Sequence, residues 1–194
     1  VFAQYDFKVS LIDVSTDALQ HALNTIDKNL NRQIKKQLIS EGDKIRTLAN
    51  IQTYTSVEGG VSNSDLVIEA ATENQPLKIS LFKTIDEVAP PHAILATNTS
   101  SISITKIASS TRRAERVIGM HFMNPVPMMK LVEVIRGFHT TDEVANTILA
   151  LSKSLDKVAV EVNDYPGFVS NRILMSMVNE AIYTLYEGVG GVYE

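Results

Sequence analysis

The stretch "DLVIEAATENQPLKISLFKTIDEVAPPHAILATNTSS", residues 65–101, decides the fold class. It begins with an apolar run of strand length, residues 65–71, and it contains a second such run, residues 93–97. Between them, Pro76 suits the first turn of a helix, and the apolar face of this helix continues until a pair of prolines ends it. Because successive parallel strands need a crossover connection of this kind, the pattern predicts a parallel sheet with helices on both faces.

The same alternation continues upstream of this stretch. Residues 7–13 are predicted to form a buried strand, and the apolar positions from Leu19 to Ile34 recur at helical spacing. A polar stretch then leads to a predicted strand over residues 51–55. We therefore expect an α/β fold with a doubly wound, mostly parallel sheet, the architecture that binds dinucleotides.

Downstream, the order of elements changes once. Two strand-like runs, residues 116–122 and 130–135, are joined by the short loop "MNPVPMM", and such a short connection favours antiparallel pairing. A helix over residues 141–155 and a strand over residues 158–162 follow. These elements complete the predicted sheet domain.

The sequence "NDYPG" marks the predicted domain boundary. Residues 1–163 are assigned to the nucleotide-binding domain, and residues 164–194 to the start of a helical second domain, with a helix over residues 168–187. The chain begins without methionine, in what reads as the end of a helix running into a strand. We expect that a first strand and a glycine-rich loop are missing upstream.

Composition narrows the class of partner. The 194 residues are 44% hydrophobic and 21% charged, and the net charge of -4 comes from interspersed residues, so there is no basic patch for nucleic acid or for an anionic membrane. No apolar run approaches the roughly 20 residues that span a bilayer, and the first residues do not show a basic region followed by an apolar stretch. The chain has no cysteine and four scattered histidines, so we expect no metal site, a small-molecule partner and a cytoplasmic location.

The most specific candidate site is His121 with Glu133. Glu133 interrupts an apolar strand, where a carboxylate is costly unless it is paired, and His121 is the nearest partner across the short loop. An imidazole held by a carboxylate suits proton transfer. A core ion pair without a catalytic task remains the structural alternative.

Other polar residues follow the predicted strands at the edge where open α/β sheets bind ligands. Asp13 ends the first strand, where an acid can accept hydrogen bonds from an adenosine ribose, or can simply form a turn. Asn98 and Ser100 lie in the cluster "ATNTSS", which is either part of a ligand site or a polar turn.

Three further residues stand near helix starts. Glu73 ends the run "VIEAATE", and Lys78 lies in the first turn of the next helix, where it opposes the helix dipole. A bound anion or a nearby carboxylate would explain this lysine, but spacing alone favours a solvated side chain. Asn171 begins the last helix and can either face a ligand oxygen or cap the helix.

Four strings occur in a characteristic order: "LVIEAATEN", "ATNTSSISIT", "GMHFMNPVPMMKLVEVIRG" and "PGFVSNRIL". In these strings the chain resembles the 3-hydroxyacyl-CoA dehydrogenase family, in particular the short-chain bacterial 3-hydroxybutyryl-CoA dehydrogenases. The resemblance covers essentially the whole chain. It implies a Rossmann-type fold, NAD as cofactor, an acyl-CoA substrate and a homodimer at full length.

The resemblance also implies roles for single residues. For catalysis, these are His121 as the base, Glu133 as its partner, and Ser100 and Asn171 on the reacting oxygen of the substrate. For the cofactor, these are Asp13 on the adenosine ribose, and Glu73, Lys78 and Asn98 on the nicotinamide side.

Three questions stay open in the sequence. The chain departs from the family pattern by lacking the glycine-rich turn and most of the helical domain, so whether this stretch binds NAD by itself is undecided. The same unit also occurs in multifunctional fatty-acid oxidation proteins, and a non-catalytic relative that keeps the fold is a third interpretation. Acyl-chain preference and the direction of the pathway are not encoded in these residues.

Overall fold

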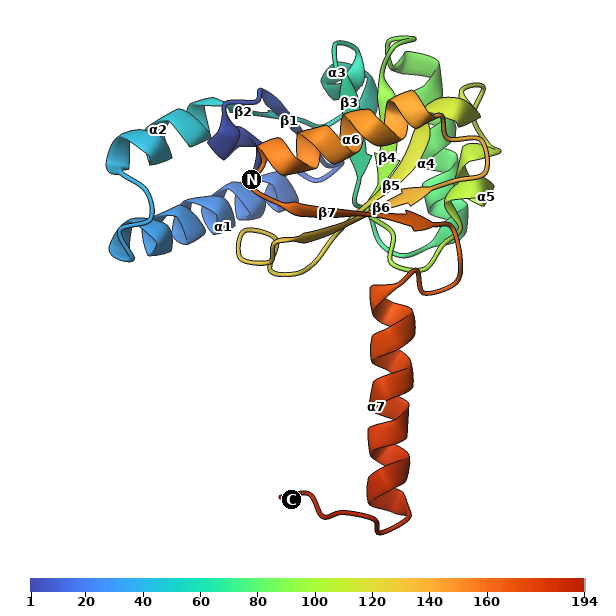
Figure 1. The fold of residues 1–194 in the computed structure, drawn as a ribbon. Coiled ribbons are helices and arrows are strands. Elements are labelled where there is room, and N and C mark those ends of the chain that lie inside the picture. The colour runs from blue at the N-terminus through green and yellow to red at the C-terminus, as the bar shows by residue number, and fades with distance from the viewer. Residues whose placement is uncertain (194) are drawn as a thin grey trace.

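The strands form two hydrogen-bonded sheets in the computed structural model, which describes residues 1–193 (Figure 1). The first sheet pairs β1 (Val9–Ile12) with β2 (Ile51–Tyr54) in parallel. The second sheet has the order β3-β4-β5-β6-β7. Its strands are β3 (Leu66–Glu69), β4 (Ile94–Thr97), β5 (Val117–Phe122), β6 (Leu131–Arg136) and β7 (Val158–Asn163).

The pairing in the second sheet is parallel except between β5 and β6. These two strands are antiparallel, as the short loop between them predicts, and their register places His121 directly opposite Glu133. The α/β fold class with a mostly parallel sheet is therefore confirmed.

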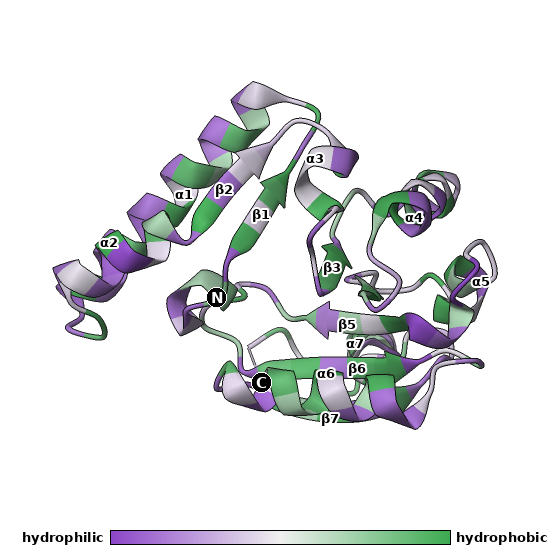
Figure 2. Ribbon diagram, turned by 90° about the horizontal axis from the view of Figure 1, so that it is seen from above, coloured by the Kyte–Doolittle hydropathy of each residue, from purple (hydrophilic) through white to green (hydrophobic). Residues whose placement is uncertain are grey.

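Helices cover both faces of the five-stranded sheet. Figure 2 shows α6 lying along β6 and β7 on one face, while α4 and α5 lie on the other side of the sheet in Figure 1. The helical elements are η1 (Phe2–Tyr5), α1 (Thr16–Lys35), α2 (Glu41–Ala49), α3 (Val57–Val61), α4 (Gln75–Val88), α5 (Ile104–Ala108), η2 (Ala114–Arg116), α6 (Asp142–Ser154) and α7 (Ser170–Tyr186).

Two apolar clusters fill the space between these layers. Phe82 and Ile85 of α4 pack with Leu95 on one face of the sheet. Met120 of β5 and Ile148 of α6 belong to the cluster on the other face. Strand residues with buried side chains on both faces produce the continuous apolar runs that the sequence shows.

Two short helices are absent from the sequence prediction. The polar stretch before β2 forms α2, which begins with a capping box in which Ser40 Oγ accepts from the Asp43 amide and the Asp43 carboxylate accepts from the Ser40 amide. The second, α3, has a one-sided cap, in which Ser56 Oγ accepts from the Gly59 amide. A serine followed three residues later by an acid is a helix-start signal, and it was available at Ser40.

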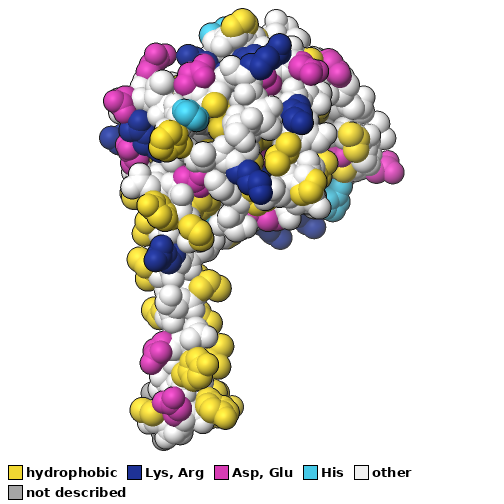
Figure 3. Space-filling model, turned by 90° about the vertical axis from the view of Figure 1, so that its right-hand side faces the viewer, with side chains coloured by type: hydrophobic (Ala, Val, Ile, Leu, Met, Phe, Trp, Pro, Cys, Tyr) yellow, Lys and Arg dark blue, Asp and Glu magenta, His cyan; other side chains and the backbone are white. Residues whose placement is uncertain are grey.

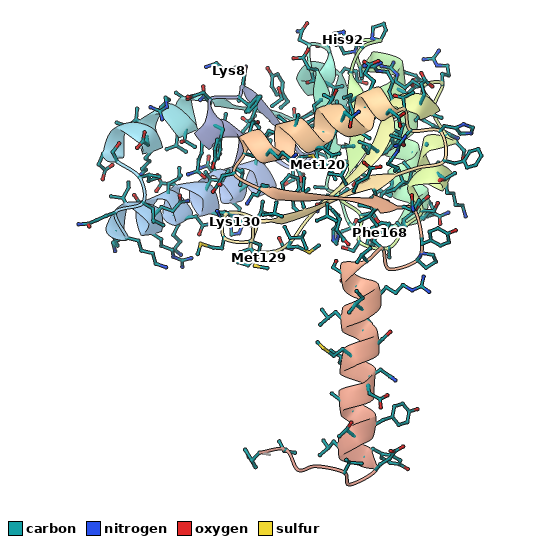
Figure 4. All side chains as sticks on the ribbon, in the orientation of Figure 1. Lys8, His92, Met120, Met129, Lys130 and Phe168 are labelled. Carbon is teal, nitrogen blue, oxygen red and sulfur yellow. The ribbon has the colours of Figure 1, made fainter. Side chains whose placement is uncertain are left out.

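The chain leaves the sheet after β7 and enters α7, which extends away from the domain (Figure 1). Asp164 anchors this connection, because its carboxylate accepts hydrogen bonds from Ser103 Oγ (2.7 Å), the Ile104 amide (3.0 Å) and the Thr105 amide (2.8 Å) at the start of α5. Phe168, labelled in Figure 4, lies where the chain turns into α7. The connection that leads into α7 is therefore fixed to the start of α5. In the described part of the chain, residues 1–193, no side chain of α7 itself is buried.

Apolar side chains are exposed along much of α7, as the yellow side chains in Figure 3 show. They include Ile173, Leu174, Met175, Met177, Val178, Ile182 and Leu185. Even so, neither α7 nor any other helix within residues 1–193 is both long and apolar enough to span a bilayer. The proposed division into two domains near Asn163 stays a prediction.

Candidate active site

His121 and Glu133 form the centre of the site. The His121 side chain is 6% exposed and the Glu133 side chain 2%, and Nδ1 of His121 lies 2.8 Å from Oε2 of Glu133. An ionised carboxylate only accepts hydrogen bonds, so Nδ1 carries the hydrogen. In the neutral imidazole, Nε2 is then the acceptor and is available as a base.

Ser100 contacts that nitrogen. Its hydroxyl oxygen lies 3.0 Å from His121 Nε2, and because Nε2 is the acceptor, the serine hydroxyl donates. Ser100 stands in the turn after β4, so the parallel β4–β5 pairing brings its hydroxyl to the end of the neighbouring strand. Ser100, His121 and Glu133 thus form one hydrogen-bonded chain.

Glu73 holds the turn that carries Ser100. Its Oε1 accepts from the Ser100 amide (3.1 Å), from the Ser101 amide (3.2 Å) and hydroxyl (3.0 Å), and from the Thr99 hydroxyl. Burial acts to raise the pKa of Glu73, but the hydrogen bonds from Thr99, Ser101 and Ser100 and the charge of Lys78 hold this pKa below its usual value. The carboxylate is therefore ionised at neutral pH and fixes the position of Ser100.

Lys78 lies beneath this turn and is not solvated. Its side chain is 1% exposed, and Nζ lies 2.8 Å from Glu69, 3.0 Å from the Ala71 carbonyl and 3.5 Å from Glu73. The interpretation as a solvated lysine, which spacing alone favours, is therefore wrong. The unfavourable position of Lys78 at the positive end of α4 is balanced by the carboxylate of Glu69, the last residue of β3.

Glu69 is the partner that the sequence analysis missed. Its carboxylate is buried and accepts from Lys78, from the Ala71 amide (2.6 Å) and from the Thr97 hydroxyl (2.7 Å). An acid inside the apolar run "DLVIEAA" is the same signal that singled out Glu133, and it could have identified this residue. Together, Lys78 and Glu69 tie the ends of β3 and β4 to the start of α4.

Replacing Lys78 with methionine is expected to lower the free energy of unfolding by about 3–5 kcal/mol, because the Glu69 carboxylate would stay buried without its counter-ion. Urea denaturation of the variant measures the loss. Lys83→Met on the exposed face of the same helix is the matched control, with an expected change within about 0.5 kcal/mol. Equal stabilities of the two variants would contradict a structural role for the Lys78–Glu69 pair.

Glu133 also caps the last helix. Its Oε1 accepts from the Val169 amide (3.1 Å) and the Ser170 amide (2.9 Å), and the helix has no cap from a side chain of its own N-cap residue. Burial acts to raise the pKa of Glu133, but the hydrogen bonds from Ser170, His121 and Val169 outweigh burial and lower this pKa. The positive end of α7 favours the same ionised state.

Two asparagines complete this cluster. Asn171 Nδ2 lies 3.4 Å from the Ser100 carbonyl oxygen, a long contact that places the amide beside the Ser100 turn. Asn98 Oδ1 accepts from the Phe122 amide at 2.8 Å, which leaves its amide hydrogens free for another partner. Predicted residues from five separate segments are thus brought together. Ser170 joins them as a residue that the sequence analysis did not single out.

Asp13 stands apart from this cluster, at the end of β1 in the other sheet. One carboxylate oxygen accepts from the Ser15 amide at 2.9 Å, and the Asp13 amide donates to the Tyr54 carbonyl at 3.2 Å. Tyr54 lines a cleft of about 440 Å³ between α1 and β2, together with residues that include Leu19 and Leu23. An exposed carboxylate near a cleft of mixed polar and apolar side chains fits a nucleoside, since it can accept from ribose hydroxyls and would repel a 2′-phosphate.

The comparison with known families agrees with this geometry. Residues 1–165 match the family described as "3-hydroxyacyl-CoA dehydrogenase, NAD binding domain". The probable 3-hydroxybutyryl-CoA dehydrogenase of Bacillus subtilis is 49% identical over 187 residues, which cover 96% of this chain and 65% of that protein. The human mitochondrial hydroxyacyl-coenzyme A dehydrogenase is 42% identical, over 92% of this chain and 58% of that protein.

A solved structure shows the same fold. The (S)-3-hydroxybutyryl-CoA dehydrogenase of Ralstonia eutropha superposes with a TM-score of 0.95 at 47% sequence identity, covering 98% of this chain and 67% of that one. The chain thus spans 65% of the length of the Bacillus relative and 58% of the length of the human one.

Proposed function

Because this chain belongs to the 3-hydroxyacyl-CoA dehydrogenase family, we propose that the whole protein interconverts an L-3-hydroxyacyl-CoA and the 3-ketoacyl-CoA with NAD. The observation that carries the proposal is the hydrogen-bonded chain Ser100–His121–Glu133, in which the imidazole is held by the carboxylate at Nδ1 and accepts from a hydroxyl at Nε2. A structural ion pair needs no third polar group at that nitrogen. The names of the similar bacterial proteins favour a short acyl chain such as 3-hydroxybutyryl.

His121 acts as the base in the oxidation direction. Its Nε2 takes the proton of the substrate 3-hydroxyl, and Glu133 stabilises the imidazolium that forms. In the reduction direction, the same nitrogen returns the proton to the 3-keto oxygen. Because Nδ1–H is fixed on Glu133, the imidazole keeps the tautomer in which Nε2 faces the substrate.

Ser100 and Asn171 orient the reacting oxygen. The Ser100 hydroxyl reaches His121 Nε2 and the Asn171 amide lies beside the same turn, so both can donate to an oxygen placed at Nε2. Holding the oxygen in this way fixes the direction of the hydrogen on carbon 3, which is a contribution of positioning to the rate.

The polar groups of this chain fit both ends of an NAD molecule. Asp13 suits the adenosine ribose, and Glu73, Lys78 and Asn98 suit the nicotinamide side. There, the amide hydrogens of Asn98 have no partner among residues 1–193, and Oε2 of Glu73 has only the Lys78 ammonium group beside it, at 3.5 Å. NAD supplies the hydride acceptor when it is bound. The buried Lys78 acts by positioning Glu73, since its ammonium group is surrounded by Glu69, Ala71 and Glu73.

A homodimer is part of the proposal. The exposed apolar side chains of α7 support it, because a helix that is apolar on several sides is typical of a helix buried in the assembled protein. The acyl-CoA partner follows from the proposed reaction, and a cytoplasmic location stays a prediction from sequence.

The test is acetoacetyl-CoA-dependent oxidation of NADH by the whole protein, followed by absorbance, with acetoacetate lacking CoA as the control. Turnover with the CoA ester and little with the free acid is the expected result. NADH binding without turnover would favour a non-catalytic relative that keeps the fold. Turnover coupled to a hydratase activity on the same polypeptide would instead identify a multifunctional protein.

A further inference from the structure

Ser170 contacts the Glu133 carboxylate with two different groups. Its backbone amide donates to Oε1 at 2.9 Å, and its hydroxyl donates to Oε2 at 2.8 Å. A cap of α7 requires only the backbone contact, because helix N-termini are satisfied when their amides find acceptors. The hydroxyl contact therefore needs a separate explanation.

That hydroxyl shares its acceptor atom with His121. Oε2 of Glu133 lies 2.8 Å from Ser170 Oγ and 2.8 Å from His121 Nδ1, so this one oxygen accepts from both donors. A hydroxyl that donates to a carboxylate oxygen stabilises its charge and reduces its affinity for a further proton. The second donor thus weakens the pull of Oε2 on the imidazolium.

Few charged groups other than each other face His121 and Glu133. On the Nε2 side, Ser100 links the imidazole to Glu73, whose charge is balanced by Lys78. On the α7 side, the first helical turn carries no acid, and its charged residue is Arg172, two positions after Ser170 in the chain. The ring of Phe168, 5.9 Å from that of His121, is apolar. Among residues 1–193, Glu133 is accordingly the ionised group in direct contact with His121.

We propose that Ser170 is a positioning residue of the base, and that its hydroxyl limits how strongly Glu133 holds protonated His121. A base that must take a proton in one direction and return it in the other works best when neither state is held too tightly. Ser170 sets this balance through Oε2 and does not touch the substrate in the proposed reaction. This inference rests on the proposed function and deepens it.

The test is the pH dependence of kcat/KM for oxidation of 3-hydroxybutyryl-CoA by the whole protein, with Ser170→Ala and Ser170→Thr. Without the hydroxyl, Glu133 stabilises the imidazolium more, so a larger fraction of the enzyme holds a protonated base at a given acidic pH. We expect the acid limb of the Ser170→Ala profile to move to higher pH by about 0.5–1 unit, the size that corresponds to the net contribution of one ordinary hydrogen bond. Ser170→Thr keeps the hydroxyl and should keep the wild-type limb.

The control is Ser176→Ala, which removes a hydroxyl that bonds the Arg172 carbonyl farther along the same helix. This variant should retain the wild-type profile. An unchanged acid limb in Ser170→Ala, or an equal loss of rate at every pH, would overturn the inference, because either result means that the hydroxyl serves only to hold α7.

A second measurement separates this inference from the proposed function. NMR titration of the His121 ring in the wild type and in Ser170→Ala needs no substrate and no turnover. If the wild type does not oxidise the CoA ester, the proposed function fails, while a shift of the His121 titration to higher pH in the variant still supports the role of Ser170. The same titration in both proteins refutes that role whatever the activity.

Discussion

Replacing His121 with glutamine is expected to lower kcat for NADH-dependent reduction of acetoacetyl-CoA by about 10²–10⁴-fold, the usual contribution of general acid–base catalysis. Glutamine is of similar size but has no nitrogen that gains and loses a proton near neutral pH. Steady-state kinetics with the whole protein give kcat and KM separately. We expect NADH affinity to stay within about twofold of the wild type, because the lost group acts in the transition state.

The matched control for this variant is His92→Gln. His92 is exposed and contacts Asp65, away from the Ser100–His121–Glu133 chain. Its replacement should leave kcat unchanged. If His121→Gln retained most of the wild-type kcat while still binding NADH, the enzyme would need a different base.

Replacing Glu133 with glutamine is expected to lower kcat by about 10²–10⁴-fold and to reduce stability as well. The neutral amide no longer stabilises the imidazolium, and it can hold the wrong tautomer of His121 by presenting a donor to Nδ1. The amide also accepts fewer hydrogen bonds than the carboxylate, which takes four from His121, Val169 and Ser170. Leaving a buried donor unsatisfied costs about 1–3 kcal/mol.

The stability of this variant should also depend less on pH. The pKa of Glu133 is lowered in the folded protein, so its ionised form contributes stability above the unfolded pKa, and this contribution is lost as the pH falls through the folded pKa. Glutamine removes that part of the acid dependence. Thermal unfolding as a function of pH measures it, with the exposed Glu143→Gln as control. Acid sensitivity equal to that of the wild type would contradict the ionised state of Glu133.

The sequence predicts the sheet well because its strands are buried on both faces. Residues 66–71 and 93–96 are apolar except for Glu69. The short loop between β5 and β6 leaves antiparallel pairing as the accessible geometry. Given that pairing, the sequence identifies His121 as the nearest partner for Glu133, and the register of β5 and β6 places the two residues opposite each other. The missed helix α2 has a mostly polar sequence, so its capping box is a weaker signal than apolar spacing.

The contacts that the sequence does not predict are those between separate segments. Whether Lys78 is solvated or buried depends on how α4 lies over the end of β3, and no local pattern encodes that angle. The contact of Ser170 with Glu133 depends on the turn between β7 and α7, which brings together residues 37 positions apart. In both cases the local sequence is compatible with an exposed residue, and tertiary packing decides.

The central claim is that Glu133 and His121 act as one unit, and the most direct measurement is a double-mutant cycle. The rates of NADH oxidation with acetoacetyl-CoA are compared for the wild type, His121→Gln, Glu133→Gln and the double variant. Residues that act together lose function together, so we predict that the double variant is no more than about threefold slower than His121→Gln alone. Losses that multiply in the double variant would show that Glu133 contributes independently of His121 and would contradict the account.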